Sequence, residues 1–449
     1  MTQISVPWGR ENLSIELPPN WTLLQVAQPA LRAAEADWPE RIALALSQPS
    51  SGLSLPKLLA ARRSGRIVLV LEDATRHSPL PQILEVVLRE FRFARISLDQ
   101  VEVLFATGMH PPMTADQARA KLAQFASELT WRSNPWQDRR RYVRVGQFGG
   151  VDVRIERALA EADLRVIVSS VSPHLQAGFG GGYKMFVPGC CYLETIRALH
   201  RRGIDRTARQ LVGLNEDRNP MRAVIDQAGA ALDARGGKTF ALQYLLDGDD
   251  LPAYVAGGEV LPTYRMVAKQ CAVASGIVPA GPADVLITNA HPRDYDLWQC
   301  FKSIPNTRWA ARPNGVIICL ARCEAGLHGM NVPRRWPLGP TTMRRLVRLL
   351  GPEALAGLVT RLVPRLAGDA AFFVRMALQA LHRNRILMVS PRLVEEIARF
   401  PGLPLFADVQ QAVEHADRLL GGPGKPQRVV VYPSGGATFP IPTAEDTRQ

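Results

Sequence analysis

The stretch "DLRVIVSSVSPHLQAGFGGGYK", residues 163–184, joins a run of apolar residues to a glycine-rich loop that holds a single lysine, ten residues after a histidine. A nearly continuous apolar run that ends in turn residues is typical of a strand buried in a parallel sheet. Glycine lets the backbone approach a ligand closely, so a lysine in this loop is expected to face a ligand. Such a lysine can pair with a phosphate or carboxylate, or act as a nucleophile. The glycine spacing matches neither the Walker nor the dinucleotide-binding fingerprint.

Six further segments have the same pattern of an apolar, β-branched run that ends in polar or glycine-rich residues. They are 66–76, 100–110, 283–292, 315–323, 385–390 and 427–436. Helical periodicity lies between them, for example in 81–91, 115–129 and 340–382. The alternation of strands and helices predicts an α/β protein with mainly parallel sheets.

The length of 449 residues predicts more than one domain, because a single compact core rarely grows to this size. The segment 270–283 is rich in Gly, Pro and Ala, and we place a boundary there. The sequence therefore predicts an N-terminal α/β domain over 1–275 and a C-terminal α/β domain over 276–424. It leaves open whether the segment 425–449 packs back on the first domain. We expect the active site in the cleft between the two domains.

The net charge of +13 comes mostly from arginine, which is densest at 138–144 and 201–209. This charge leaves open a nucleotide- or polyanion-binding protein. The chain has no basic helix with interleaved aromatics and no zinc-finger spacing among its six cysteines, so a solvated basic surface is the simpler interpretation. It also has no signal region and no apolar run long enough to cross a bilayer. We expect a cytoplasmic protein that binds neither nucleic acid nor a membrane.

Charged and polar residues follow the predicted strands, at the edge where open α/β sheets bind their ligands. After the first three strands these residues are Asp73, Thr75, Arg76, His110, His174 and Lys184, and after the strand at 283–292 they are Gln299 and Lys302. Each residue alone has an ordinary interpretation, such as a helix cap or a loop histidine. His200 lies on a predicted helix, and one histidine holds a metal only where a cofactor supplies the remaining donors.

Taken together, the motifs resemble the lactate racemase family. They are DATR (73–76), TGMH (107–110), SPH (172–174), AGFGGGYK (177–184), TIRALH (195–200) and DLWQCFK (296–302), with VYPSGGATFP (431–440) as a further similarity. The resemblance implies an isomerase, a racemase or epimerase of a 2-hydroxy acid. It also implies a nickel-pincer nucleotide, pyridinium-3-thioamide-5-thiocarboxylic acid mononucleotide, as the cofactor. Cofactor-biosynthesis and nickel-insertion enzymes would then be partners of the chain.

The resemblance also implies roles for individual residues. Lys184 would form a thioamide with the cofactor, and His200 would be the fourth nickel ligand in a square-planar site. His110 and His174 would be the paired acid/base residues. The remaining residues would contact the cofactor or the substrate: Asp73, Thr75, Arg76, Gly181 and Gly182 on the cofactor side, and Arg76, Trp298, Gln299 and Lys302 on the substrate side.

Some positions depart from the usual pattern of the family. Pro111 follows the first histidine where arginine is usual, and Trp298 stands where tyrosine is usual. Gly180 replaces a common serine, and Pro135 a common histidine. The lysine and the histidines are retained, so these departures bear on which 2-hydroxy acid is the substrate rather than on the chemistry.

The residue types suit proton-coupled hydride transfer. The C–H bond beside a hydroxyl and a carboxylate is barely acidic, whereas removal of a hydride together with the hydroxyl proton gives a planar 2-keto acid. A histidine is suited to take that proton near neutral pH. Two alternatives stay open: a 2-hydroxy-acid oxidoreductase that uses a soluble nicotinamide, and a non-catalytic nucleotide- or polyanion-binding protein. The first alternative lacks the expected glycine fingerprint.

Overall fold

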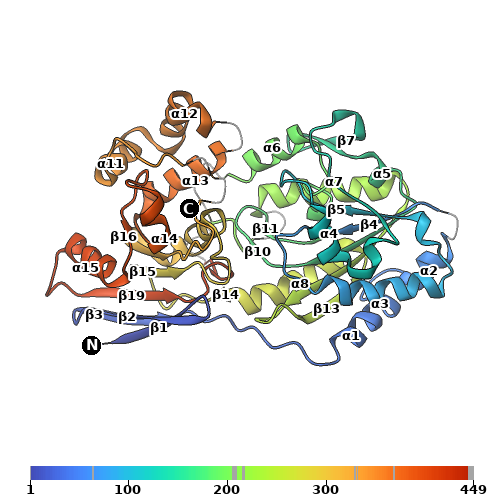
Figure 1. The fold of residues 1–449 in the computed structure, drawn as a ribbon, viewed down its shortest axis with the longest axis horizontal. Helices are drawn as coiled ribbons and strands as arrows, with labels where there is room; N and C mark the ends of the chain where they lie inside the picture. The colour runs from blue at the N-terminus through green and yellow to red at the C-terminus, as the bar shows by residue number, and fades with distance from the viewer. Residues whose placement is uncertain are drawn as a thin grey trace. The chain divides into compact units, whose positions relative to one another are not determined.

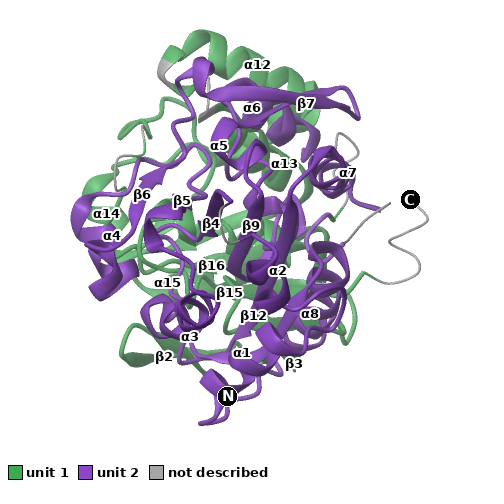
Figure 2. Cartoon of the chain, turned by 90° about the vertical axis from the view of Figure 1, so that its right-hand side faces the viewer, with its two compact units in different colours: residues 1–29, 206–210, 275–449 green, residues 30–205, 211–274 purple. Residues whose placement is uncertain are grey.

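The computed structural model describes residues 2–62, 65–204, 210–214, 218–327, 330, 332–367 and 370–442. The chain divides into two compact units, and each is described by itself (Figure 2). Unit 2 holds residues 30–205 and 211–274. Unit 1 holds residues 1–29 and 275–449, together with a short segment that includes Gln210.

Unit 2 is built on a six-stranded sheet of order β13-β12-β9-β4-β5-β6, of which Figure 1 labels β4, β5 and β13. The strands are β13 (Pro252–Gly258), β12 (Lys238–Leu246), β9 (Leu164–Ser170), β4 (Ile67–Leu71), β5 (Val101–Phe105) and β6 (Thr130–Ser133). All neighbours are parallel except β13, which runs antiparallel to β12. Every residue of β4 and β9 is buried, which is why these segments read as continuous apolar runs in the sequence.

Helices cover both faces of this sheet, because alternate side chains of its strands point to opposite sides. Ile67, Leu69 and Leu71 pack with the helices of one face, which are α1 (Trp38–Ser47), α2 (Leu55–Ala60), α3 (Leu80–Phe93) and α4 (Ala115–Leu122). Val68 and Val70 pack with those of the other face, which are α5 (Arg157–Ala160), α6 (Leu193–Arg202), α7 (Pro220–Arg235) and the start of α8 (Val260–Ser275).

The predicted helix over 115–129 is shorter in the structure. α4 begins at a capping box in which the Thr114 hydroxyl accepts from the Gln117 N–H and the Gln117 side chain accepts from the Thr114 N–H. It ends where Ala123 has a φ of 49°, and a 3₁₀ turn, Ala123–Ala126, follows. The helical periodicity of the sequence continues beyond this point, so it did not indicate where the helix ends.

Unit 1 is built on a second six-stranded sheet of order β18-β17-β16-β15-β19-β3, in which all neighbours are parallel. The strands are β18 (Leu405–Phe406), β17 (Arg385–Val389), β16 (Ala311–Leu320), β15 (Ala283–Asn289), β19 (Gln427–Tyr432) and β3 (Trp21–Val26). One face packs against α15 (Val409–Leu420) and the hairpin of β1 (Gln3–Trp8) and β2 (Glu11–Glu16). The predicted α/β class with mainly parallel sheets is confirmed.

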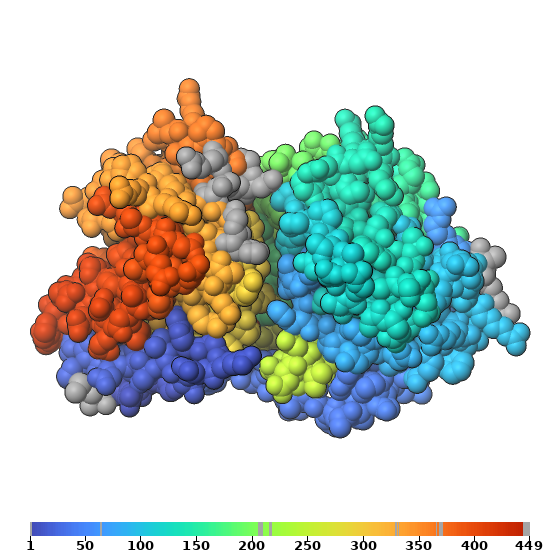
Figure 3. Space-filling model, viewed as in Figure 1, coloured from blue at the N-terminus to red at the C-terminus, as the bar shows by residue number. Residues whose placement is uncertain are grey.

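The other face of this sheet packs against a group of shorter helices. They are α9 (Leu297–Cys300), α10 (Ser303–Thr307), α11 (Pro340–Leu350), α12 (Pro352–Leu362), α13 (Ala370–Arg383) and α14 (Pro391–Glu396). α11 and α12 lie at the surface (orange in Figure 3), where Leu349 and Leu362 are exposed. The helical pattern seen across 340–382 therefore corresponds to three helices.

The two ends of the chain are assigned differently in the structure and in the sequence-based division. β3 pairs in parallel with β19, so that Trp21 lies opposite Gln427. Residues 1–29 therefore leave the predicted N-terminal domain, and β19 joins the sheet of unit 1 instead of packing back on that domain. The sequence could not indicate this, because the two paired strands lie about 400 residues apart and share no local signal.

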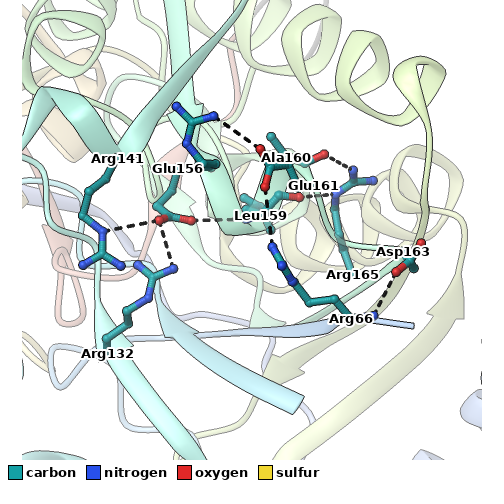
Figure 4. Close-up of polar contacts among 10 residues, drawn as sticks. Arg66, Arg132, Arg141, Glu156, Leu159, Ala160, Glu161, Asp163 and Arg165 are labelled. Atoms are coloured by element: carbon teal, nitrogen blue, oxygen red, sulfur yellow. Dashed lines mark hydrogen bonds and ion pairs between the residues drawn. The ribbon is translucent and has the colours of Figure 1, made fainter. Parts of the chain in front are cut away.

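Part of the basic cluster at 138–144 is used within unit 2. Arg141 lies 3.8 Å from Glu156, and Arg132 lies 3.0 Å from the same carboxylate (Figure 4). Glu156 also caps α5 by accepting from the Leu159 N–H. Arg144 pairs with Asp152 at 2.5 Å. These internal partners favour a structural role for this part of the charge over polyanion binding.

Candidate functional site

Three adjacent strands of unit 2 end in the residues that the sequence singled out. Asp73 follows β4, His110 follows β5, and His174 lies just after β9 in the short strand β10 (Pro173–His174). Because β9, β4 and β5 are neighbouring parallel strands, their carboxyl ends meet at one edge of the sheet. The fold thus gathers these side chains within one unit.

Asp73 and His110 form a direct pair. Asp73 Oδ2 lies 2.5 Å from His110 Nδ1, and Asp73 Oδ1 accepts from both the hydroxyl and the N–H of Thr75. Burial opposes ionisation of Asp73, but the hydrogen bond and charge of His110, the charge of Arg76 and the Thr75 hydroxyl hold its pKa well below the usual range. The carboxylate therefore accepts the Nδ1 proton, which leaves Nε2 of the neutral His110 ring as an acceptor.

His174 is held in the opposite way. Its Nδ1 accepts from the backbone N–H groups of Gln176 and Ala177, at 3.3 and 3.1 Å. A nitrogen that accepts two N–H groups carries no proton, so the neutral ring keeps its proton on Nε2. The two histidines therefore differ: His110 has an acceptor at Nε2, and His174 has a donor there.

The glycine loop is tightly enclosed. Gly181 and Gly182 have φ angles of 75° and 60°, and the Gly182 N–H donates to Gln243 Oε1 at 2.7 Å. A Cβ at Gly181 would lie 2.5 Å from the same oxygen, and one at Gly182 would lie 2.8 Å from the Tyr264 ring. Both positions thus need glycine for conformation and for space.

Lys184 lies in the 3₁₀ turn Gly182–Met185 that follows these glycines. Burial, together with the charges of Arg76 and Arg222, lowers the pKa of Lys184 to about 7, and the charge of Asp73 opposes this shift only in part. The Gly189 N–H donates to the Lys184 carbonyl at 3.2 Å, and the Gly189 carbonyl accepts from the Gly108 N–H at 2.9 Å, so the segment after Lys184 lies against the loop after β5. At neutral pH a substantial fraction of the lysine is the uncharged amine, which is the nucleophilic form.

His200 lies in the last turn of α6, and its side chain is half-buried. Gln176 connects this helix to the His174 loop, because its side-chain amide donates to the His200 carbonyl at 3.0 Å while its backbone N–H donates to His174. The described part of the chain holds no group of three or more His, Cys, Asp or Glu side chains arranged to bind a metal ion.

Three of the four predicted substrate-side residues, Trp298, Gln299 and Lys302, lie in unit 1, on and after α9, whereas Arg76 lies in unit 2. Asp296 caps this helix by accepting from the Gln299 N–H at 2.7 Å. Lys302 Nζ donates to Gln299 Oε1 at 2.8 Å. The Trp298 ring packs against Phe373 of α13, with 3.5 Å between ring centroids. The expectation of a site between the two predicted domains stays a prediction.

Four residues of the site region escaped the sequence analysis. Arg222, which is fully buried, donates to the Ala177 and Phe179 carbonyls of the glycine loop and pairs with Asp226. The other three hold backbone or buried polar groups close to the strand ends: Gln243, Asn134 and Glu72. Glu72 directly precedes Asp73 at the end of a predicted strand, so its position could have identified it. The positions of Arg222, Gln243 and Asn134 in the sequence gave no such indication.

The chain matches the family model described as the lactate racemase N-terminal domain over residues 8–211. A lactate racemase of Thermoanaerobacterium thermosaccharolyticum is 28% identical over 351 residues, covering 75% of this chain and 78% of the relative. A lactate racemase of Lactiplantibacillus plantarum is 26% identical over 336 residues, covering 73% and 76%. Among the described residues, no helix is both long and apolar enough to span a bilayer.

Two solved structures share the fold. The lactate racemase apoprotein of T. thermosaccharolyticum superimposes with a TM-score of 0.80 at 21% identity, covering 98% of this chain and all of that one. A Thermotoga maritima protein superimposes with a TM-score of 0.63 at 16% identity, covering 93% and 99%. Family model, relatives and fold agree with the motif order of the sequence. The chain thus resembles the lactate racemases over about three quarters of its length, and its residues 8–211 match the model of their N-terminal domain.

Proposed function

We propose that the chain is a racemase or epimerase of a 2-hydroxy acid. The observation that carries this proposal is the Asp73–His110 pair at the carboxyl ends of β4 and β5. A histidine held by a carboxylate can accept the proton of a substrate hydroxyl, and the low pKa of Lys184 suits covalent attachment of a cofactor. The relatives are named lactate racemases, which makes lactate the first substrate to test. Pro111 and Trp298 favour a pocket that differs from theirs.

The residues of unit 2 fit a nickel-pincer nucleotide. Lys184 offers a partly neutral amine for a thioamide bond. Contact of Gly181 and Gly182 with the cofactor stays a prediction, because a Cβ at these positions would meet Gln243 and Tyr264. His200 would supply one imidazole to nickel, and the nucleotide would supply the other donors. Thr75 and Arg76 would bind its phosphate. When bound, this cofactor supplies a pyridinium carbon that accepts a hydride.

The two histidines would move the hydroxyl proton. His110, oriented by Asp73, would take the proton of the substrate hydroxyl at Nε2 while the C–H hydride leaves, and the product is a 2-keto acid. His174 would present its Nε2–H to the oxygen when the keto acid shows its other face. Return of the hydride to that face inverts the centre. The Gln299–Lys302 pair would hold the substrate carboxylate.

The test is peptide mass spectrometry with metal analysis, on protein made together with the cofactor-biosynthesis and nickel-insertion enzymes. The proposal expects a covalent adduct on the peptide that contains Lys184, about one nickel per chain, and conversion of D-lactate or a larger 2-hydroxy acid into its enantiomer or epimer. Lys184→Ala serves as the matched control and should lose the adduct. A fully loaded protein that racemises no 2-hydroxy acid would overturn the activity.

A further inference from the structure

Two arginines of unit 1 meet on one indole ring. Arg308 begins the 3₁₀ turn Arg308–Ala310, and its Cζ lies 4.4 Å from the centroid of the Trp309 ring. Arg383 ends α13, 75 residues further along the chain, and its Cζ lies 5.2 Å from the same ring. Both distances are within the range of cation–π contacts, so two positive charges converge on one aromatic side chain.

Arg308 differs from the other two buried arginines of the described chain. Arg165 donates to three backbone carbonyls and pairs with Asp233, and Arg222 donates to two carbonyls and pairs with Asp226. Arg308 is only 5% exposed, yet its Nε has no hydrogen-bond partner among the described residues. Buried guanidinium groups are normally satisfied by acceptors, as the first two are.

The charge of Arg308 is also not compensated by a described carboxylate. Burial and the nearby charge of Arg383 lower the pKa of Arg308 to about 9, and no acidic group acts in the other direction. An arginine nevertheless stays protonated in proteins at neutral pH. The fold therefore keeps two like charges close together. Arg383 donates to the Ala311 carbonyl at 3.3 Å, whereas the buried Arg308 has no described carboxylate to offset its charge.

We propose that Arg308, Arg383 and Trp309 form a binding site for a small oxyanion, namely a carboxylate or phosphate group. Arg308 and Arg383 lie just before the first residues of β16 and β17. The site is thus at the amino-terminal edge of the second sheet, whereas α9 with Gln299 follows the carboxyl end of β15. An oxyanion would accept from the unpartnered Nε and separate the two positive charges.

The site is tested by measuring the Tm of the protein in chloride buffer and after addition of inorganic phosphate or acetate at constant ionic strength, with isothermal titration as the direct readout. A ligand that binds only the folded protein raises its Tm. Stabilisation by both anions would indicate a carboxylate-sized oxyanion site, and stabilisation by phosphate alone a phosphate site. No stabilisation beyond that of chloride would overturn the proposal.

Substitution of the two arginines tests whether the anion binds at this site. Arg308→Met and Arg383→Met should each weaken anion binding by about tenfold or more, because each removes one of two charge-assisted donors. Arg348→Met, on the exposed face of α11, removes an equal charge and should change nothing. Because Arg76 is proposed to bind a phosphate elsewhere, the titrations are repeated with Arg76→Ala. Wild-type affinity in both Arg308→Met and Arg383→Met would place the anion at another site.

One further measurement separates an anion site from a purely structural arginine. In anion-free buffer Arg308→Met should keep or raise the Tm, because it replaces an uncompensated buried charge with an apolar side chain of similar length. A large fall in Tm in this buffer would show that the guanidinium is satisfied within the fold, which contradicts the proposal. If Arg308→Met does not fold, Arg308→Gln, which is also neutral but keeps a polar side chain, gives the same comparison.

Discussion

The loop after β5 and the loop after β9 each present a histidine, but they hold it by different means. The side chain of His110 is 47% exposed, and its ring pairs with the Asp73 carboxylate. His174 lies beside a glycine loop whose backbone is buried and fixed by Arg222 and Gln243. The Asp73 carboxylate fixes the proton position of the His110 ring, and we expect its loss to change activity more than stability. The anchors of the His174 loop are part of the buried core, so we expect their loss to lower both stability and activity.

The comparison is tested most directly by removing each ring. His110→Ala and His174→Ala should each lower turnover by about 10²–10⁴-fold or more, because each removes a proton-transfer group. Both variants should keep nickel and the adduct on Lys184, as measured by metal analysis and peptide mass spectrometry. Loss of nickel in either variant would mean that the metal ligand and the acid/base residues are assigned the wrong way round.

Asp73→Asn tests the anchor of the first loop. Without the carboxylate, the Nδ1–H form of His110 is no longer favoured, so kcat should fall by about 10²–10⁴-fold. The Tm should change less than kcat does, because asparagine has nearly the same volume and its side-chain oxygen can still accept from Thr75 at this buried position. Thr75→Ser, which keeps the hydroxyl that donates to Asp73, is the matched control and should keep most of the activity. Equal loss of stability and activity in Asp73→Asn would indicate a structural carboxylate instead.

Arg222→Met tests the anchor of the second loop. It leaves the Ala177 and Phe179 carbonyls and the Asp226 carboxylate without their partner, in a buried position. The free energy of unfolding should fall by about 3–5 kcal/mol, as measured by urea denaturation. Arg235→Met, whose guanidinium is bound nearer the surface to the Arg144 and Val145 carbonyls, should cost less. If Arg222→Met lowers the free energy of unfolding no more than Arg235→Met does, the His174 loop is not anchored more strongly than the His110 loop.

The smallest effect is expected for the pH dependence of stability. In the cofactor-free protein the folded pKa of Lys184, about 7, lies below the unfolded value of 10.5. Between these values the unfolded state binds the extra proton, so stability should rise with pH from about 7 to 10.5, by at most about 1.4 kcal/mol per unit. Solvent at this half-buried side chain reduces that slope.

Lys184→Met should flatten this part of the profile, and urea denaturation at pH 7 and pH 9 measures the difference. Lys238, an exposed residue at the start of β12, provides the control substitution and should leave the slope unchanged. A slope in Lys184→Met equal to that of the wild type would mean that Lys184 has an ordinary pKa.

Much of the fold could be predicted because its signals are local. β4 and β9 are buried on both faces, so β4 is apolar throughout and β9 is apolar except at Arg165, Ser169 and Ser170. The helices between the strands keep their periodicity. The candidate site residues could be singled out for a related reason: polar residues directly after such strands must lie at the ligand-binding edge. The predicted domain bounds differ from the structure where strands far apart in the sequence pair with each other, as β3 and β19 do.

The sequence by itself determined the α/β class, the strand ends, the glycine loop with its lysine and the motif order of the lactate racemase family. Only the tertiary structure decided which partner each side chain has. Asp73 was expected to contact the cofactor, and the fold pairs it with His110, 37 residues away. Arg222 and the Arg308–Trp309–Arg383 cluster likewise depend on segments brought together by strand order. A contact of this kind leaves no periodicity in the chain, because its energy comes from three-dimensional proximity and not from neighbouring residues.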